Sequence, residues 1–248
     1  MLRQTLGGAL AAAIALSAAP ALADEGMWTF DNFPAAKVAQ AYGVKTDQKW
    51  LDRVQAASVR LTSGCSASLV SKQGLVFTNH HCVVDCVQSL SDDKTDYVKD
   101  GFLTTARTEV MLWAGMQAEV LVSITDLTAD IGKATAGKTG IDFVKARDAA
   151  KGAAETVACG KDEAFRCQLV TLYRGGQYKL YKYRKYSDVR LVFAPELATA
   201  FFGGDPDNFN FPRFNLDAAF VRLYENGKPI ASPQHLIWQS RATKDGEV

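Results

Sequence analysis

The sequence predicts a mainly β protein with helical insertions, and two patterns carry that prediction. From residue 58 onward, short apolar runs are separated by turn residues, which is typical of antiparallel strands. Residues 126–157 are instead rich in Ala, Lys, Asp and Glu, with apolar residues spaced three apart as on one helix face. The two patterns occupy different stretches, so we expect strands interrupted by a helical insertion near residues 126–160.

The elements follow in order along the chain. Helices are expected over residues 31–42 and 47–57, where apolar residues recur at helical spacing. The helical insertion is expected to break near residues 137–140, which begin and end with glycine. The expected strands are residues 58–61, 66–71, 75–78, 118–124, 178–186, 189–193 and 218–224.

Composition limits the classes of function. The 248 residues hold 28 Lys+Arg and 27 Asp+Glu, a formal net charge of +1, which gives no reason to expect a nucleic-acid partner. Residues 178–186 do mix basic and aromatic side chains, as an anionic-lipid or nucleic-acid surface would. We favour a solvated antiparallel strand there, because the rest of the chain has no basic excess. A hydrophobic fraction of 48% excludes a disordered chain.

Residues 1–23 have the pattern of a secretory signal peptide. They combine a basic start, a long apolar run and a small-x-small exit, which predicts cleavage before Asp24. The alternative is an uncleaved anchor helix, for which the run is at the short end. We therefore expect residues 24–248 to be periplasmic or secreted, with no membrane association after cleavage.

Five cysteines remain in an exported chain, where disulfides form and persist. The odd count leaves one thiol without a partner inside the chain. Cys159 and Cys167 are close enough in sequence to close a small loop. Cys65 can pair with either Cys82 or Cys86, and the sequence alone leaves that choice open.

A zinc site is the alternative use of these cysteines. It would combine Cys65, Cys82 and Cys86 with His80 or His81. The spacing lacks the paired short intervals of common structural zinc sites, so no metal is expected.

The first segment that contains candidate catalytic residues is 64–82. A strand, a turn and a second strand run into Thr78-Asn-His-His-Cys82. An imidazole at a strand end is well placed to act as a general base near neutral pH.

The second such segment is residues 202–213, followed by Asp217. Its glycines and two prolines predict an ordered loop, in which Asp205 and Asp207 are turn residues. A calcium loop is the alternative, but the pattern of oxygen ligands is incomplete. Asp217 opens an apolar strand, where a carboxylate can accept the Nδ1–H of a histidine and fix its tautomer.

These segments together resemble one known family. Thr78-Asn-His-His-Cys82, and Gly203-Gly-Asp-Pro-Asp-Asn-Phe-Asn-Phe-Pro-Arg213 ending in Asp217, are similar to the exported bacterial dipeptidyl-peptidases 7 and 11, peptidase family 46 of the serine class. Residues 25–34 and 50–61 resemble the start of the mature proteins of that family.

The resemblance implies a chymotrypsin-like, trypsin-type double β-barrel, of which this chain would hold mostly the first barrel. The activity would be the removal of dipeptides from peptides with a free N-terminus, without a cofactor. His81 would be the general base, with His80 as the less favoured candidate, and Asp217 would orient it. Asn208 and Phe209 would bind the substrate's terminal ammonium. The resemblance also suggests a homodimer for the full-length protein.

Two departures from the family pattern stand out. Position 209 is Phe where the family has Trp. No Gly-Asn-Ser-Gly-type segment supplies the serine nucleophile, and nothing favours Ser66 or Ser68 in that role. We therefore expect an N-terminal fragment that is inactive alone. The alternative is an exported pseudo-peptidase that serves as a binding module.

Overall fold

The computed structural model describes residues 27–107 and 110–244. The predicted signal peptide, residues 1–23, lies outside the described residues. Residues up to Pro34 form a separate unit, of which the described part holds one 3-10 turn, η1 (Phe30–Asn32). Everything below concerns the unit from Ala35 onward.

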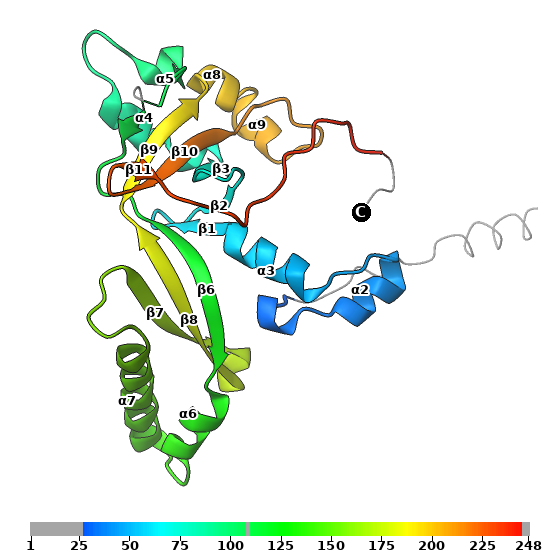
Figure 1. Ribbon diagram of the computed structural model, residues 1–248, viewed down its shortest axis with the longest axis vertical. Coiled ribbons are helices and arrows are strands. Elements are labelled where there is room, and N and C mark those ends of the chain that lie inside the picture. Colours follow the sequence, from blue (N-terminus) through cyan, green and yellow to red (C-terminus); the bar gives the residue numbers. More distant parts are fainter. Residues whose placement is uncertain (1–26, 108–109, 245–248) are drawn as a thin grey trace, which may run out of the picture. The chain divides into compact units, whose positions relative to one another are not determined.

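A ring of antiparallel strands forms the larger body of this unit (Figure 1). Its members are β1 (Ser58–Leu61), β2 (Ser66–Leu69), β3 (Leu75–Thr78), β6 (Ala118–Asp126), β8 (Gln177–Tyr186), β9 (Asp188–Ala194) and β10 (Ala219–Glu225). Hydrogen bonds join them in the order β9, β10, β3, β2, β1, β6, β8.

The ring closes because β8 continues into β9 with only Ser187 between them. On one side of this junction Tyr186 pairs with Ala118 of β6, and on the other Asp188 pairs with Tyr224 of β10. One bent segment thus connects the two ends of the ladder, and the strands surround a single core. This is one barrel; the second barrel that the resemblance implies stays a prediction.

Alternating side chains fill the barrel, as expected for strands with one buried face. Along β10, Val221 and Leu223 are fully buried, while Phe220 and Arg222, which alternate with them, point to the other side. Leu61 and Leu191 meet them from β1 and β9. Each such fully buried side chain contributes about 1.5–3 kcal/mol to stability, so this core holds the strand ends in place.

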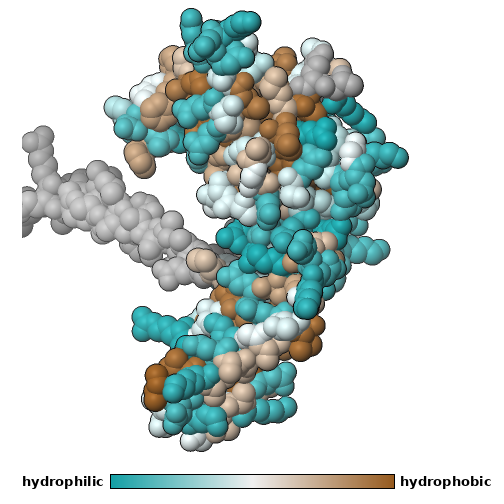
Figure 2. Space-filling view, turned by 90° about the vertical axis from the view of Figure 1, so that its left-hand side faces the viewer, coloured by the Kyte–Doolittle hydropathy of each residue, from teal (hydrophilic) through white to brown (hydrophobic). Residues whose placement is uncertain are grey.

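Beyond the barrel, β6 and β8 extend into an arm that also contains β7 (Phe165–Leu172), α6 (Thr128–Thr135) and α7 (Gly140–Cys159). The predicted helical insertion is therefore present, and it breaks between the two helices where expected. A small core of its own includes Ile131, Leu169 and Leu180. On the face that Figure 2 shows, hydrophilic colours predominate over the arm, and its apolar groups form small separate patches.

The basic and aromatic segment at residues 178–186 is β8, the central strand of the arm. Its neighbours β6 and β7 occupy both of its edges. Two of its cations, Lys182 and Arg184, lie over the ring of Phe165 in β7, 4.5 and 5.2 Å from its centre. The segment is an antiparallel strand with these two charges packed against its own sheet.

Two helices precede β1, namely α2 (Ala35–Tyr42) and α3 (Gln48–Ala57). The remaining elements are short: η2 (His80–Cys82), α4 (Val84–Leu90), α5 (Tyr97–Asp100), β4 (Phe102–Leu103), β5 (Met111–Leu112), η3 (Tyr173–Gly175), α8 (Leu197–Ala200), α9 (Gly204–Asn208) and β11 (Lys228–Pro229). Among the described ranges, no helix combines the length and apolar character needed to cross a bilayer.

Candidate active site

The pairing of β3 with β10 creates the site. Thr78, the last residue of β3, lies opposite Ala219, the first residue of β10. Because the strands are antiparallel, the residues that follow β3 meet those that precede β10. The ladder thus brings His81 to Asp217, although they are 136 positions apart in sequence.

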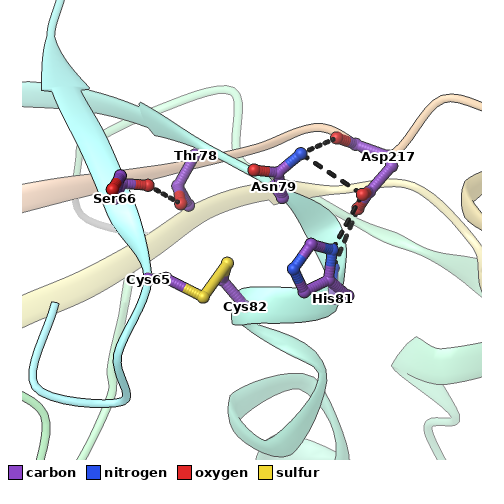
Figure 3. Close-up of a disulfide and its surroundings, with 7 residues drawn as sticks. All are labelled: Cys65, Ser66, Thr78, Asn79, His81, Cys82 and Asp217. Carbon is purple, nitrogen blue, oxygen red and sulfur yellow. Dashed lines mark hydrogen bonds and ion pairs between the residues drawn. A yellow bond between two sulfur atoms is a disulfide. The ribbon is translucent and has the colours of Figure 1, made fainter. Parts of the chain in front are cut away.

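Asp217 contacts both the side chain and the main chain around His81 (Figure 3). Its Oδ2 lies 2.8 Å from His81 Nδ1, and its Oδ1 accepts a hydrogen bond of 3.0 Å from the His81 backbone N–H. The side-chain amide of Asn79 donates to Oδ2 at 3.2 Å and to the Asp217 carbonyl at 3.1 Å. These contacts fix the carboxylate relative to the imidazole and to the turn that carries it.

The carboxylate is ionised at neutral pH. Partial burial raises the pKa of Asp217, but hydrogen bonds from His81 and Asn79 and the His81 charge outweigh it, so the net pKa is below its usual range. An ionised Asp217 can accept the Nδ1–H of His81, an arrangement that would point Nε2 away from the carboxylate. The His81 side chain is 67% exposed and that of Asp217 17%, so the imidazole faces the solvent while the carboxylate is shielded.

A disulfide anchors the turn that carries His81. Cys65 is bonded to Cys82, which links the segment just before β2 to the residue just after His81 (Figure 3). The hydroxyl of Thr78 adds a hydrogen bond of 3.0 Å to the Ser66 carbonyl. The histidine is therefore fixed on both sides to the neighbouring strand.

The remaining cysteines complete the pairing that the sequence left open. Cys159 and Cys167 form a second disulfide, and Cys86 is a free, buried thiol. Burial raises the pKa of Cys86 to about 12, so it stays protonated. The alternative zinc site loses two of its thiolates, because Cys65 and Cys82 are bonded to each other.

A cleft of about 570 Å³ opens beside the pair, and we call it the His81 cleft. Its lining comes from η2, α4, α8 and α9 and from the residues that follow β3, α8 and α9. The lining residues are Asn79, His80, His81, Val84, Leu197, Ala200, Phe201, Asn208, Phe209, Arg213, Asn215 and Asp217. All four predicted site residues thus border one cleft. None of these lining residues carries a hydroxyl or a thiol.

The predicted ligand-binding residues lie at the end of the short helix α9. The Asn208 side-chain oxygen accepts a hydrogen bond of 2.6 Å from Arg213, which also donates to the Asn208 carbonyl at 3.0 Å. The ring of Phe209 is 88% exposed. Gly203 before the helix has a φ of +85°, and a Cβ there would overlap the Asp207 side chain, so this turn requires glycine.

Sequence reasoning missed part of the cleft wall. Leu197 and Ala200 come from α8, which was not predicted, and Phe201 follows it. Arg213 was quoted only as part of a motif. The adjoining Phe201 and Phe202, both exposed, were the available signal, since paired aromatics next to two glycines are unusual on a solvated loop.

Comparison with known proteins places the chain in a family. The sequence model described as Peptidase S46 matches residues 23–248. The chain belongs to the peptidase S46 family. It is 33% identical over 225 residues to an Asp/Glu-specific dipeptidyl-peptidase of Porphyromonas endodontalis, covering 84% of this chain and 31% of that protein. It is 32% identical over 225 residues to dipeptidyl-peptidase 7 of Porphyromonas gingivalis, covering 87% of this chain and 31% of that protein.

A solved structure supports the same placement of this S46 family member. The crystal structure of P. endodontalis DPP11 in complex with the dipeptide Arg-Glu superposes with a TM-score of 0.76 at 25% identity. The match covers 90% of this chain and 36% of that one. The chain therefore spans about a third of the length of the relatives it matches.

Proposed function

We propose that this S46 family member acts as a serine-type dipeptidyl aminopeptidase, with His81 as general base and Asp217 as the residue that orients it. One observation carries the proposal: the 2.8 Å contact between His81 Nδ1 and Asp217 Oδ2 at the edge of the His81 cleft. The names of the relatives, all dipeptidyl-peptidases, supply the reaction class.

In the proposed reaction, His81 Nε2 takes the proton of a serine hydroxyl as the serine attacks the scissile carbonyl. Asp217 stabilises the imidazolium that forms, and His81 then returns the proton to the leaving amine. The lining of the His81 cleft holds no hydroxyl. We therefore propose that the serine lies in a region that corresponds to the part of the relatives beyond the match with this chain.

The α9 end of the cleft is proposed to bind the free N-terminus. The Asn208 oxygen has two lone pairs, and Arg213 uses one of them, so the second can accept from a substrate ammonium. The exposed Phe209 ring stands beside it and limits the space beyond the amine. A peptide held at its terminus presents its second peptide bond to the base, which explains release of dipeptides.

The second barrel of the predicted fold is proposed to cover an aromatic face next to the site. Phe77 of β3 and Phe220 of β10 have ring centres 5.2 Å apart, and Trp238 lies about equally close to both, at 6.0 and 6.2 Å. Trp238 is 64% exposed and Ile237 74% exposed. Clustered apolar side chains of this kind mark surfaces that bind other protein.

The decisive experiment uses the protein translated from the complete reading frame. Reporter peptides with a free N-terminus, and the same peptides acetylated, are assayed with H81A, D217N and a control, H235N. We expect H81A and D217N to lower kcat/KM by about 10⁴-fold, H235N to leave it unchanged, and acetylated peptides to be resistant. Full activity in H81A would refute the role of His81.

Two alternatives give different outcomes. A pseudo-peptidase binding module would bind free-amine peptides without hydrolysing them, whatever stands at position 81. A zinc protein would show reactive thiols and stoichiometric metal. The structure instead predicts no thiol that reacts in the folded chain and one, Cys86, that reacts after unfolding.

A further inference from the structure

The amide that we propose to receive the substrate ammonium, that of Asn208, has little support from packing. Asn208 is the last residue of α9, which has only five residues and no side-chain hydrogen bond at its N-cap. The rings of Phe209 and Phe211 beyond it are almost fully exposed. An amide side chain that rotates freely must lose that freedom when it binds a ligand, which weakens binding. Some other contact is needed to hold Asn208 in place.

Arg213 provides that contact. Its Nη1 donates a hydrogen bond of 2.6 Å to Asn208 Oδ1 and one of 3.0 Å to the Asn208 carbonyl. Both hydrogen bonds end on one residue, so they fix its side chain relative to its own main chain. A guanidinium has donors but no acceptor, so it pairs with the amide oxygen and not with the amide nitrogen. Arg213 therefore determines which atom of the amide lies on its side.

The turn between these two residues is held from within. The Asn210 side-chain amide donates to the Pro206 carbonyl at 2.7 Å, and the Asn210 backbone N–H donates to the Asp207 carbonyl at 3.2 Å. These hydrogen bonds fold the chain back on α9. Arg213 then closes the turn by returning to the last residue of the helix.

The same short segment leads on to the catalytic pair. Three residues after Arg213, the Leu216 backbone N–H donates to the Thr199 carbonyl of α8 at 3.0 Å. The next residue is Asp217, whose carboxylate contacts His81 at 2.8 Å. Arg213 thus lies in sequence between the amine end of the His81 cleft and the base, and it borders the cleft itself.

The charge of Arg213 has the opposite effect on an ammonium. A cation next to Asn208 Oδ1 repels a second cation that approaches the same oxygen. Arg213 is exposed, however, so water and salt screen this repulsion. A hydrogen bond from a charged donor is about twice as strong as one between neutral groups. We therefore expect the orienting effect of Arg213 to outweigh its repulsion.

From these contacts we infer that Arg213 is a positioning residue, which holds the Asn208 amide oxygen in place for the substrate ammonium. The inference rests on the proposed function, because it concerns the amine end of the same site. It assigns to Arg213 no contact with the substrate, so its effect should depend entirely on Asn208.

The first test measures kinetics with the protein from the complete reading frame on free-amine reporter peptides. R213M keeps an unbranched side chain but has neither donor nor charge. We expect it to raise KM about tenfold and to change kcat less than about twofold, since the base is untouched. R213K retains the charge and one donor nitrogen, and both contacts come from one nitrogen, so its KM should rise only about threefold.

The matched control is R174M, which removes an exposed arginine from η3 in the arm. It should leave both kinetic constants unchanged, and thermal unfolding shows that each variant is folded. A lower KM in R213M would overturn the inference, because repulsion of the ammonium would then be the main effect of Arg213.

A double-mutant cycle tests whether the effect passes through Asn208. N208A should itself raise KM, and R213M should add less than about twofold in the N208A background. If R213M raised KM equally with asparagine or alanine at position 208, the two residues would act independently and the inference would be wrong.

The second test measures binding without turnover. Calorimetry compares a free-amine reporter peptide with its acetylated form on H81A and on H81A/R213M. We expect H81A to prefer the free amine, and the second substitution to reduce that preference about tenfold. If H81A binds both peptides equally, the amine site of the proposed function fails, and this inference with it. If both proteins show the same preference, only the role of Arg213 is refuted.

Discussion

At the scale of single residues, Asp217 should make the stability of the fold depend on pH. Its pKa lies below the ordinary value of about 3.9, so its contribution is complete above about pH 4 and disappears as the pH falls through the folded-state pKa. D217N should therefore cost about 1.5–3 kcal/mol at pH 7, and the difference from wild type should shrink in acid. Urea unfolding between pH 7 and 2.5 measures it.

The exposed Asp205 provides the matched comparison for this prediction. The free energy of unfolding of D205N should differ little from that of wild type at any pH. If the difference in this free energy between wild type and D217N stayed constant down to pH 2.5, Asp217 would not make the hydrogen bonds that the structure shows.

Glu119 of β6 is a buried carboxylate that connects the barrel to the arm. Its side chain is 2% exposed and accepts from Arg166 at 2.6 and 2.7 Å, while Arg60, itself 50% exposed, adds a contact at 3.3 Å. Removing one partner of a buried pair costs about 3–5 kcal/mol, and losing an exposed ion pair about 0–1 kcal/mol.

We therefore expect E119A to lower the free energy of unfolding by about 3 kcal/mol and R60A by less than about 1 kcal/mol. Urea unfolding at neutral pH measures both. Equal losses of unfolding free energy in the two variants would mean that the buried pair of Glu119 and Arg166 adds nothing to stability beyond the Arg60 contact.

At the scale of elements, the two disulfides differ in the length of chain that they close. Cys65 and Cys82 are 17 positions apart, and Cys159 and Cys167 are 8 apart. Loop-closure entropy gives about 3.2 kcal/mol for the first and about 2.6 kcal/mol for the second. C65A/C82A should be the less stable double variant, also because Cys82 is buried. Thermal unfolding of both compares them, and the reverse order would contradict the entropic account.

Elements with strong local patterns were predictable from the sequence. Strands 58–61 and 75–78 have the predicted bounds, and the glycines at 137 and 140 separate α6 from α7 as expected. β7 was missed although Phe165, Cys167 and Leu169 alternate with polar residues, because arginine and glutamine between them obscure the apolar face. α8 and α9 have four and five residues, too few for helical periodicity to appear.

The same limit applies to the site. Local motifs singled out four residues that border the His81 cleft, His81, Asp217, Asn208 and Phe209, since each lies near a strand end or in a glycine-rich loop. Their meeting depends on the register of β3 with β10, which joins segments well over a hundred positions apart, and no local pattern encodes it. The Arg213 contact with Asn208 was hidden too, because it depends on the short helix α9, which has too few residues to show a helical pattern.

At the scale of the whole molecule, the barrel places the His81–Asp217 pair at the edge of the cleft. The pairing of β3 with β10 brings the two residues together. The lining of the His81 cleft, however, contains neither hydroxyl nor thiol. Losing the nucleophile of such a triad removes a factor of about 10⁶ in rate.

We therefore predict that the 248 residues alone release no dipeptide above background, whereas the protein from the complete reading frame does. Purified samples of both are assayed on free-amine reporter peptides, with H81A in the longer protein as the inactive reference. A burst of product stoichiometric with the shorter chain would contradict the prediction, because it would require a nucleophile among these residues. Silence from both proteins would instead favour the binding module.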